Sequence, residues 1–173
     1  MIRRIAWIER KFSFDFPAGL FPNILERVRG TPARLEDRLL SLPREILTRR
    51  DGEKWSMQEH AGHLLDLGGL DLGRLDDFEA GAEILRAADM KNRRTYEADH
   101  NANAIENILR EFRAERAEFV RRLEEYTEEF VHRSALHPRL KIEVRVVDLA
   151  FFIAEHDDHH LASIGELARL FVK

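Results

Sequence analysis

The sequence contains no cysteine, which excludes disulfides, thiolate metal ligands and a cysteine nucleophile. It also lacks an apolar run long enough for a transmembrane helix. Charged residues interrupt the first ten positions well before the length of a signal-peptide core. We therefore expect a soluble, cytoplasmic protein without membrane contact, whose chemistry rests on histidine, carboxylate or hydroxyl groups or on a bound cofactor.

An excess of basic charge is also missing. The formal net charge is −4, and lysine and arginine alternate with aspartate and glutamate instead of clustering, so binding to nucleic acid is not expected. Apolar residues make up 44% and charged residues 35% of the chain, a balance typical of a globular protein with amphipathic helices. A length of 173 residues fits one domain over 1–173, in which 1–20 form an N-terminal arm.

Hydrophobic periodicity predicts a mainly helical bundle. Gly30 and Pro32 are capable of dividing the first helix into two pieces. Ser56 and Glu59 form a capping-box pattern at the start of the second helix, where each side chain satisfies a free backbone N–H of the first turn. The four expected helices cover residues 21–42, 56–78, 102–126 and 144–171.

Two segments lie outside the predicted helices. Residues 12–16 alternate apolar and polar side chains as a strand or an extended arm does, and we expect this arm to lie across the bundle. Residues 81–100 are polar and poorly periodic, which predicts a long connection between the second and third helices with room for a short helix. Long connections of this kind often form the walls or lids of sites.

Two histidines occupy apolar-face positions of the last helix. His156 and His160 are four residues apart, so their rings leave the same helix face one turn apart and can converge on one metal ion. Asp157 stands where the glutamate of a zinc-protease H-E-x-x-H motif would be, which excludes that class. The alternative is one buried, hydrogen-bonded histidine and one exposed histidine. Burial of both favours metal, since two buried imidazoles each need a partner.

A third ligand should come from a facing helix, and the second helix offers His60 and His63. Asp66, one turn after His63, would either accept a hydrogen bond from that ring or lie in solvent. His159 lies beside the apolar face and is expected to be a bystander, although it could replace one ligand. Three histidines leave coordination positions open, which is typical of a catalytic metal site.

Other polar residues have open interpretations. Arg116 interrupts the apolar face of the third helix, so it should either extend to solvent or project into a cavity and contact an anionic substrate group. His100, His132 and His137 are expected to be solvated. The side chains of Asp157 and its neighbour Asp158 should point away from the apolar face, and no acid or base is therefore assigned.

The chain resembles the DinB/YfiT-like family. The resemblance rests on Trp55-Ser56 opening a helix, on Glu59, His63-Leu64 and Asp66 within it, and on a terminal helix that carries His156, His159-His160-Leu161 and Ile164. It implies an all-α four-helix bundle, often dimeric, in which one divalent metal ion is held by His63, His156 and His160.

The resemblance further implies a metal-dependent enzyme acting on a small molecule, either a hydrolase that uses water or an S-transferase that uses a low-molecular-weight thiol. The alternative is a non-catalytic dimeric bundle whose metal site is structural or vestigial. Three imidazoles suit zinc, nickel, iron or copper, and we expect zinc or nickel.

Overall fold

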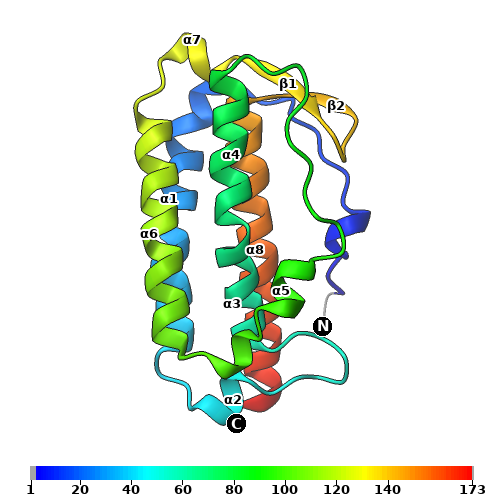
Figure 1. Ribbon diagram of the computed structural model, residues 1–173, viewed down its shortest axis with the longest axis vertical. Helices are drawn as coiled ribbons and strands as arrows, with labels where there is room; N and C mark the ends of the chain where they lie inside the picture. The colour runs from blue at the N-terminus through cyan, green and yellow to red at the C-terminus, as the bar shows by residue number, and fades with distance from the viewer. Residues whose placement is uncertain (1–2, 173) are drawn as a thin grey trace.

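The computed structural model describes residues 3–172 as a four-helix bundle (Figure 1). Its long columns are α1 (Phe21–Leu39), α3 (Met57–Asp66) continued by α4 (Gly68–Glu79), α6 (Ile105–Glu124) and α8 (Val146–Phe171). Short helices α2 (Arg44–Leu47), α5 (Arg93–Glu97) and α7 (Glu128–Val131) lie in the connections. The predicted fold class is confirmed. None of the described helices combines the length and apolarity needed to cross a membrane.

The second column is two helices instead of the single predicted one. Leu67 joins them in a right-handed helical conformation, and the two glycines that follow weaken the helix at this point. A Cβ atom on Gly68 would lie 1.6 Å from Glu115 Oε2, so glycine permits the close approach of α6. The capping box at Ser56 and Glu59 is confirmed, and it fixes the start of α3.

The first column is continuous, so Gly30 and Pro32, although capable of dividing it, do not. A proline inside a helix costs about 3 kcal/mol, because a backbone hydrogen bond is lost. Burial of α1 residues on both sides of Pro32, among them Val28 and Leu35, offsets this cost. Packing of the whole helix against α6 and α8 therefore outweighs the local preference.

A short antiparallel hairpin precedes α8 and was not predicted. Its strands are β1 (Ser134–His137) and β2 (Ile142–Arg145), and Ile84 from the connection after α4 bridges to Leu136. Each strand has only four residues, too few for a clear alternating pattern. The hairpin holds His137 and the following turn against the side of the bundle.

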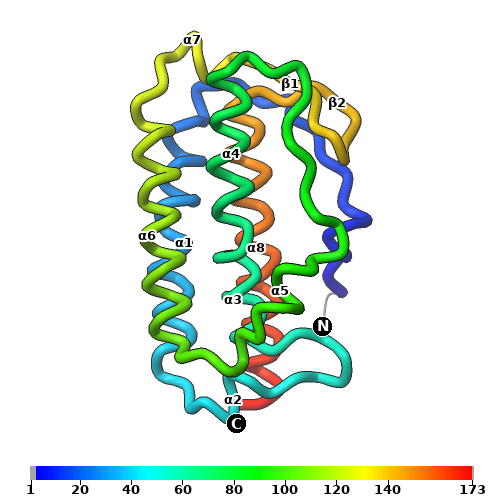
Figure 2. The backbone as a smooth tube through the Cα atoms, in the orientation of Figure 1, coloured from blue at the N-terminus to red at the C-terminus, as the bar shows by residue number. Residues whose placement is uncertain are grey.

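The described part of the N-terminal arm is extended, apart from two short 3-10 turns, and it runs along α8 instead of across the bundle (Figure 1). Phe12 and Trp7 both contact Phe152 with ring centroids 5.0 Å apart. The connection after α4 runs on the same side of the bundle as the arm (Figure 2). These two segments cover one face of the bundle near α8.

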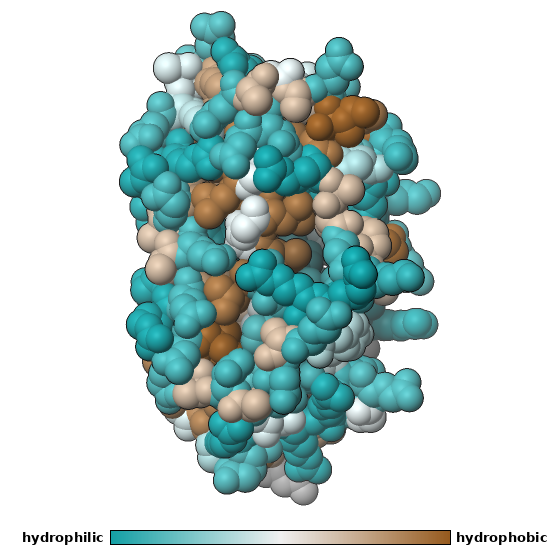
Figure 3. All heavy atoms as spheres, viewed as in Figure 1, coloured by the Kyte–Doolittle hydropathy of each residue, from teal (hydrophilic) through white to brown (hydrophobic). Residues whose placement is uncertain are grey.

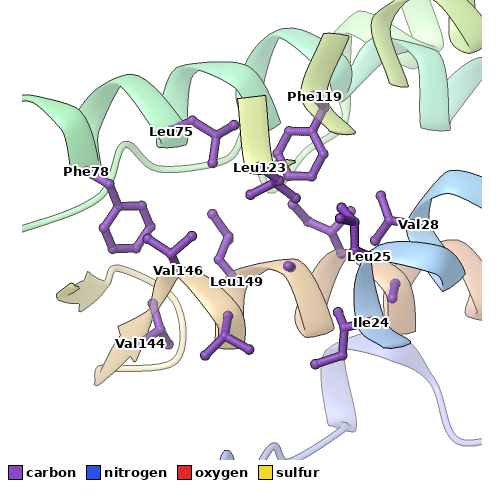
Figure 4. Close-up of a cluster of buried hydrophobic side chains, with 14 of the residues drawn as sticks. Ile24, Leu25, Val28, Leu75, Phe78, Phe119, Leu123, Val144, Val146 and Leu149 are labelled. Carbon is purple, nitrogen blue, oxygen red and sulfur yellow. The ribbon is translucent and has the colours of Figure 1, made fainter. Parts of the chain in front are cut away.

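Two apolar clusters form the core, one toward each end of the bundle. The cluster in Figure 4 joins α1, α4, α6, β2 and α8. It includes Ile24, Leu25, Val28, Leu75, Phe78, Phe119, Leu123, Val144, Val146 and Leu149. The face in Figure 3 is mainly hydrophilic, with hydrophobic residues visible in a band near its middle.

Between the two clusters lies a buried polar contact that joins three helices. Arg116 Nη2 of α6 donates to Asp157 Oδ1 of α8 at 3.0 Å, and Thr31 Oγ1 of α1 donates to Asp157 Oδ2 at 2.7 Å. Asp157 is 1% exposed, so the expectation that it points away from the core is wrong. Its neighbour Asp158 is partly exposed and pairs with Arg27 and Arg34.

We expect Asp157→Ala to lower the free energy of unfolding by about 3 kcal/mol or more, because Arg116 would keep a buried charge without a partner. Glu36→Ala is the matched control, since Glu36 pairs with Arg113 of α6 at a partly exposed position. Its loss should be much smaller. Denaturant titration followed by circular dichroism measures both. Similar losses for the two variants would contradict the role given to Asp157.

Candidate metal centre

Three histidine rings meet where α3 faces α8. His63 comes from the second turn of α3, and His156 and His160 come from successive turns of α8. Each residue offers one ring nitrogen, and these nitrogens all lie within 4.8 Å of one another. The Nε2 atoms of His156 and His160 are 3.1 Å apart. The three residues predicted as a metal site are therefore adjacent.

The positions of these rings are fixed by neighbouring side chains. His63 Nδ1 lies 3.0 Å from Thr95 Oγ1 of α5, and His60 Nδ1 lies 2.8 Å from His160 Nδ1. In both rings Nδ1 has a partner, which leaves Nε2 for another ligand. His60 is thus a neighbour of the cluster that helps to orient His160.

Burial keeps the three rings neutral near pH 7. It lowers the pKa of His63 to about 4, and it lowers the pKa of His156 and of His160 well below the ordinary value. Trp55 packs on His63 with ring centroids 4.8 Å apart, and Trp7 packs on His156 at the same separation. Neutral imidazoles are the form that binds metal ions.

Asp66 does not contact His63 directly. His100 Nε2 donates to Asp66 Oδ2 at 2.8 Å. Burial raises the pKa of Asp66, but hydrogen bonds from His100 and Thr95 lower it overall. Thr95 therefore stands between the His63 ring and the Asp66 carboxylate. Sequence reasoning had no signal for Thr95, because it lies in the connection.

Two histidines expected in solvent are buried instead. His100 is 4% exposed and His137 is 2% exposed, whereas His132 is exposed as expected. The His100 ring packs directly over Gly62, where a Cβ atom would lie 2.2 Å from its Cγ. Close approach of the connection to α3 therefore requires glycine at this position.

A cavity of about 550 Å³ opens beside the three histidines. Its walls come from α3, α4, α8, the hairpin, the connection after α4 and the arm. His159 also lines it, and Arg4 of the arm contacts that ring at 2.7 Å. Arg116 is not among the lining residues, since its guanidinium lies over Phe112 and Phe119 and pairs with Asp157. Neither alternative expected for Arg116 is observed.

One buried carboxyl group lines this cavity, and sequence reasoning missed it. Asp71 of α4 is 8% exposed, and burial raises its pKa to about 6, against the opposing effect of Arg116 and Arg74. A carboxyl group with such a pKa can both hold and release a proton near neutral pH. In the sequence, Asp71 stands out only as an acidic residue in an otherwise apolar part of the second predicted helix.

The comparisons with known proteins agree with this fold. A family model described as the DinB superfamily matches residues 27–164. The chain belongs to the DinB superfamily. A solved structure of YfiT from Bacillus subtilis, described as a probable metal-dependent hydrolase with an unusual four-helix bundle topology, is similar in fold, with a TM-score of 0.74 and 20% sequence identity. The match covers 94% of this chain and 93% of YfiT. No curated protein matches the chain significantly.

Asp71→Asn should give a pH-dependent change in stability. The folded pKa of about 6 exceeds the ordinary value of about 3.9. The folded state therefore binds more protons than the unfolded state between these values, and Asp71 lowers stability as the pH rises through that window. From pH 4 to pH 7, the variant should gain roughly 2–3 kcal/mol relative to wild type.

Denaturant titrations at the two pH values measure this gain. Asp37→Asn, at an exposed position of α1, is the control and should show no such difference. A gain of the same size in both variants, or none in Asp71→Asn, would contradict the raised pKa.

Proposed function

We propose that this DinB-superfamily protein is a metal-dependent hydrolase that acts on a small molecule in the cavity beside His63, His156 and His160. The observation that carries this proposal is the convergence of three neutral imidazoles on a cavity wall. Three protein ligands leave positions free for water and substrate, which is the arrangement of catalytic metal sites. YfiT, with the same fold, is described as a probable metal-dependent hydrolase, which is consistent with this function.

The three residues fit a divalent ion such as zinc or nickel. Zinc binds histidine nitrogen at about 2.0–2.1 Å in tetrahedral geometry, which separates two ligand nitrogens by roughly 3.3 Å. The Nε2 atoms of His156 and His160 are 3.1 Å apart, close to that separation. His63 needs only a small shift, because all three ligand atoms lie within 4.8 Å of one another.

A divalent ion bound there supplies Lewis-acid chemistry, which polarises carbonyl or phosphoryl groups and lowers the pKa of water. Residues of this chain would exclude water and transfer the proton. Trp7 and Trp55 pack against the histidine rings and exclude bulk water from one side of each. Asp71, a buried carboxyl group that lines the same cavity, is the residue we assign to hold or release a proton in hydrolysis, because burial raises its pKa to about 6.

Metal content tests the first part of the proposal. Protein purified without a histidine tag should contain about one equivalent of one divalent metal per chain, as expected for three ligands that share one site. His63→Ala, His156→Ala and His160→Ala should each lose it, while His132→Ala, at an exposed position, should retain it. Elemental analysis of folded variants measures this.

Hydrolysis of a small activated ester such as p-nitrophenyl acetate, before and after chelation, tests the second part. Activity that needs the metal supports the proposal. Retained metal binding without hydrolysis of any ester, amide or phosphate substrate in a broad panel would contradict it and favour a structural metal.

Thr95, which contacts His63 Nδ1, provides a separate test of the metal site. Thr95→Val removes the hydroxyl group that accepts from His63 Nδ1 and should weaken metal binding by about 10- to 100-fold, the usual effect of losing such a support. Competition titration with a zinc chelator measures the affinity. Thr48→Val, which removes a hydroxyl group that donates to the backbone carbonyl of Arg44 at the end of α2 and contacts none of the three histidines, should leave the affinity unchanged. Equal affinities for wild type and Thr95→Val would show that Thr95 does not support the ligand.

A further inference from the structure

The cavity has a second polar region that the histidine site does not use. Arg74 of α4, His137 of β1 and Arg139 of the turn after β1 all line it. Arg74 is 4% exposed and His137 is 2% exposed. These residues come from three separate parts of the chain, and they are brought together by the hairpin packing beside α4.

Nitrogen atoms in this region lack hydrogen-bond partners. His137 Nδ1 accepts from the backbone N–H groups of Arg139 and Leu140 at 3.3 Å, so the proton of the neutral ring is on Nε2. That Nε2 atom and Arg139 Nη2 are both buried, and neither has a partner within residues 3–172. Buried donors without partners are costly, which indicates a ligand that completes them.

The two guanidinium groups also lack a carboxylate. No Asp or Glu oxygen of the described chain lies within 4 Å of Arg74 or Arg139, and the one side-chain bond of Arg74 is from Nε to the Arg86 carbonyl at 3.2 Å. Burial lowers the pKa of both arginines, yet each remains charged at neutral pH.

Nearby acids do not neutralise this region. Asp77 is engaged by Arg86 through bonds of 2.7 and 3.0 Å. Asp71 faces Arg74 across the cavity wall and reduces the local positive charge, but it forms no ion pair with it. Asp89, also on the wall, is exposed and accepts from the backbone of Lys91 and Arg93. The buried Arg74 therefore has one nearby carboxylate that it does not contact, and the partly buried Arg139 has no carboxylate partner within the described residues.

Aromatic rings lie between this region and the histidines. The Phe152 ring lies 5.1 Å from the His137 ring and 5.0 Å from Trp7, and Trp7 in turn contacts His156. Arg139 lies over both Trp7 and Phe152. A ligand that spans the cavity would thus meet cations at one end, aromatic rings along its body and the histidine site at the other end.

We propose that Arg74, Arg139 and His137 form a subsite for an oxyanion of the substrate, a carboxylate or a phosphate attached to an apolar body. Guanidinium groups match the planar oxygen pairs of such anions, and an imidazole N–H adds one donor. This inference rests on the proposed hydrolase function and deepens it: the substrate is an anionic, partly apolar molecule, held by its charged end while its reactive bond faces His63, His156 and His160.

Tryptophan fluorescence can test the subsite directly, because both tryptophans of the chain, Trp7 and Trp55, line the cavity. The probes are phenylacetate, phenyl phosphate and the neutral phenylacetamide, titrated into zinc-loaded protein and into the same protein after chelation. At least one anion should bind about tenfold or more tightly than the amide, as charge-assisted hydrogen bonds imply. The anion that binds more tightly shows whether the subsite prefers a carboxylate or a phosphate.

The preference should disappear in Arg74→Gln and in Arg139→Gln. The control Arg110→Gln, at an exposed position of α6, should keep it with the same change in net charge. Arg139 is less buried than Arg74, so its variant keeps the test available if Arg74→Gln does not fold. Circular dichroism identifies which variants are folded.

The titration of the chelated protein separates this inference from the proposed function. A preference that persists without zinc and depends on the arginines supports the subsite even if no hydrolysis is ever detected. A preference that vanishes on chelation and ignores the arginine substitutions would assign anion binding to the metal and overturn the subsite. Equal affinity for the anions and the amide, or no binding of either anion by the wild type, would overturn it as well.

Discussion

The buried contact of Arg116, Asp157 and Thr31 determines how the fourth column sits in the bundle. It joins α6, α8 and α1 in the interior, where a charged group without a partner is costly. A rotation of α8 that exposed Asp157 would leave Arg116 unpaired, so one orientation of this helix is favoured. In that orientation the neighbouring His156 faces α3, and His160 follows one turn later. The candidate metal centre depends on this packing as much as on its own side chains.

A second polar network positions the connection between α4 and α6 against α3. His63 contacts Thr95, and Asp66 accepts from His100, so α3 is tied to two points of the connection between α4 and α6. Gln58 Nε2 adds bonds to the backbone carbonyls of His100 and Asn103. A segment with little hydrophobic periodicity is therefore held by hydrogen bonds instead of by core packing. This is why a polar connection can form a defined wall of the cavity.

The helices and the pair His156 and His160 could be predicted from sequence, because their signals are local: the period of apolar residues, a capping box at Ser56, and two histidines four residues apart. The choice of His63 over His60 rests on the family resemblance. The rest depends on which surfaces meet. Asp71 and Arg74 look like ordinary polar residues of a helix until the hairpin and the arm cover that side, and His137 looks solvated until its strand is paired. Pro32 left open whether the first helix is one piece or two, and burial along the whole helix keeps it in one piece. The hairpin itself was missed because four-residue strands carry almost no periodic signal.

The cavity is lined both by packed helices and by connecting segments. The metal-ligating candidates stand on α3 and α8, whose relative positions are fixed by the core, whereas Trp7, His137 and Arg139 stand on the arm and the hairpin. Connecting segments tolerate sequence change better than packed helices do. The arrangement of the three histidines is therefore held by the core, whereas the cavity wall formed by the arm and the hairpin depends on connecting segments. If the proposed function holds, the charge on the wall formed by the connecting segments and α4 bears on the choice of ligand, and that wall carries two arginines without carboxylate partners in the described residues.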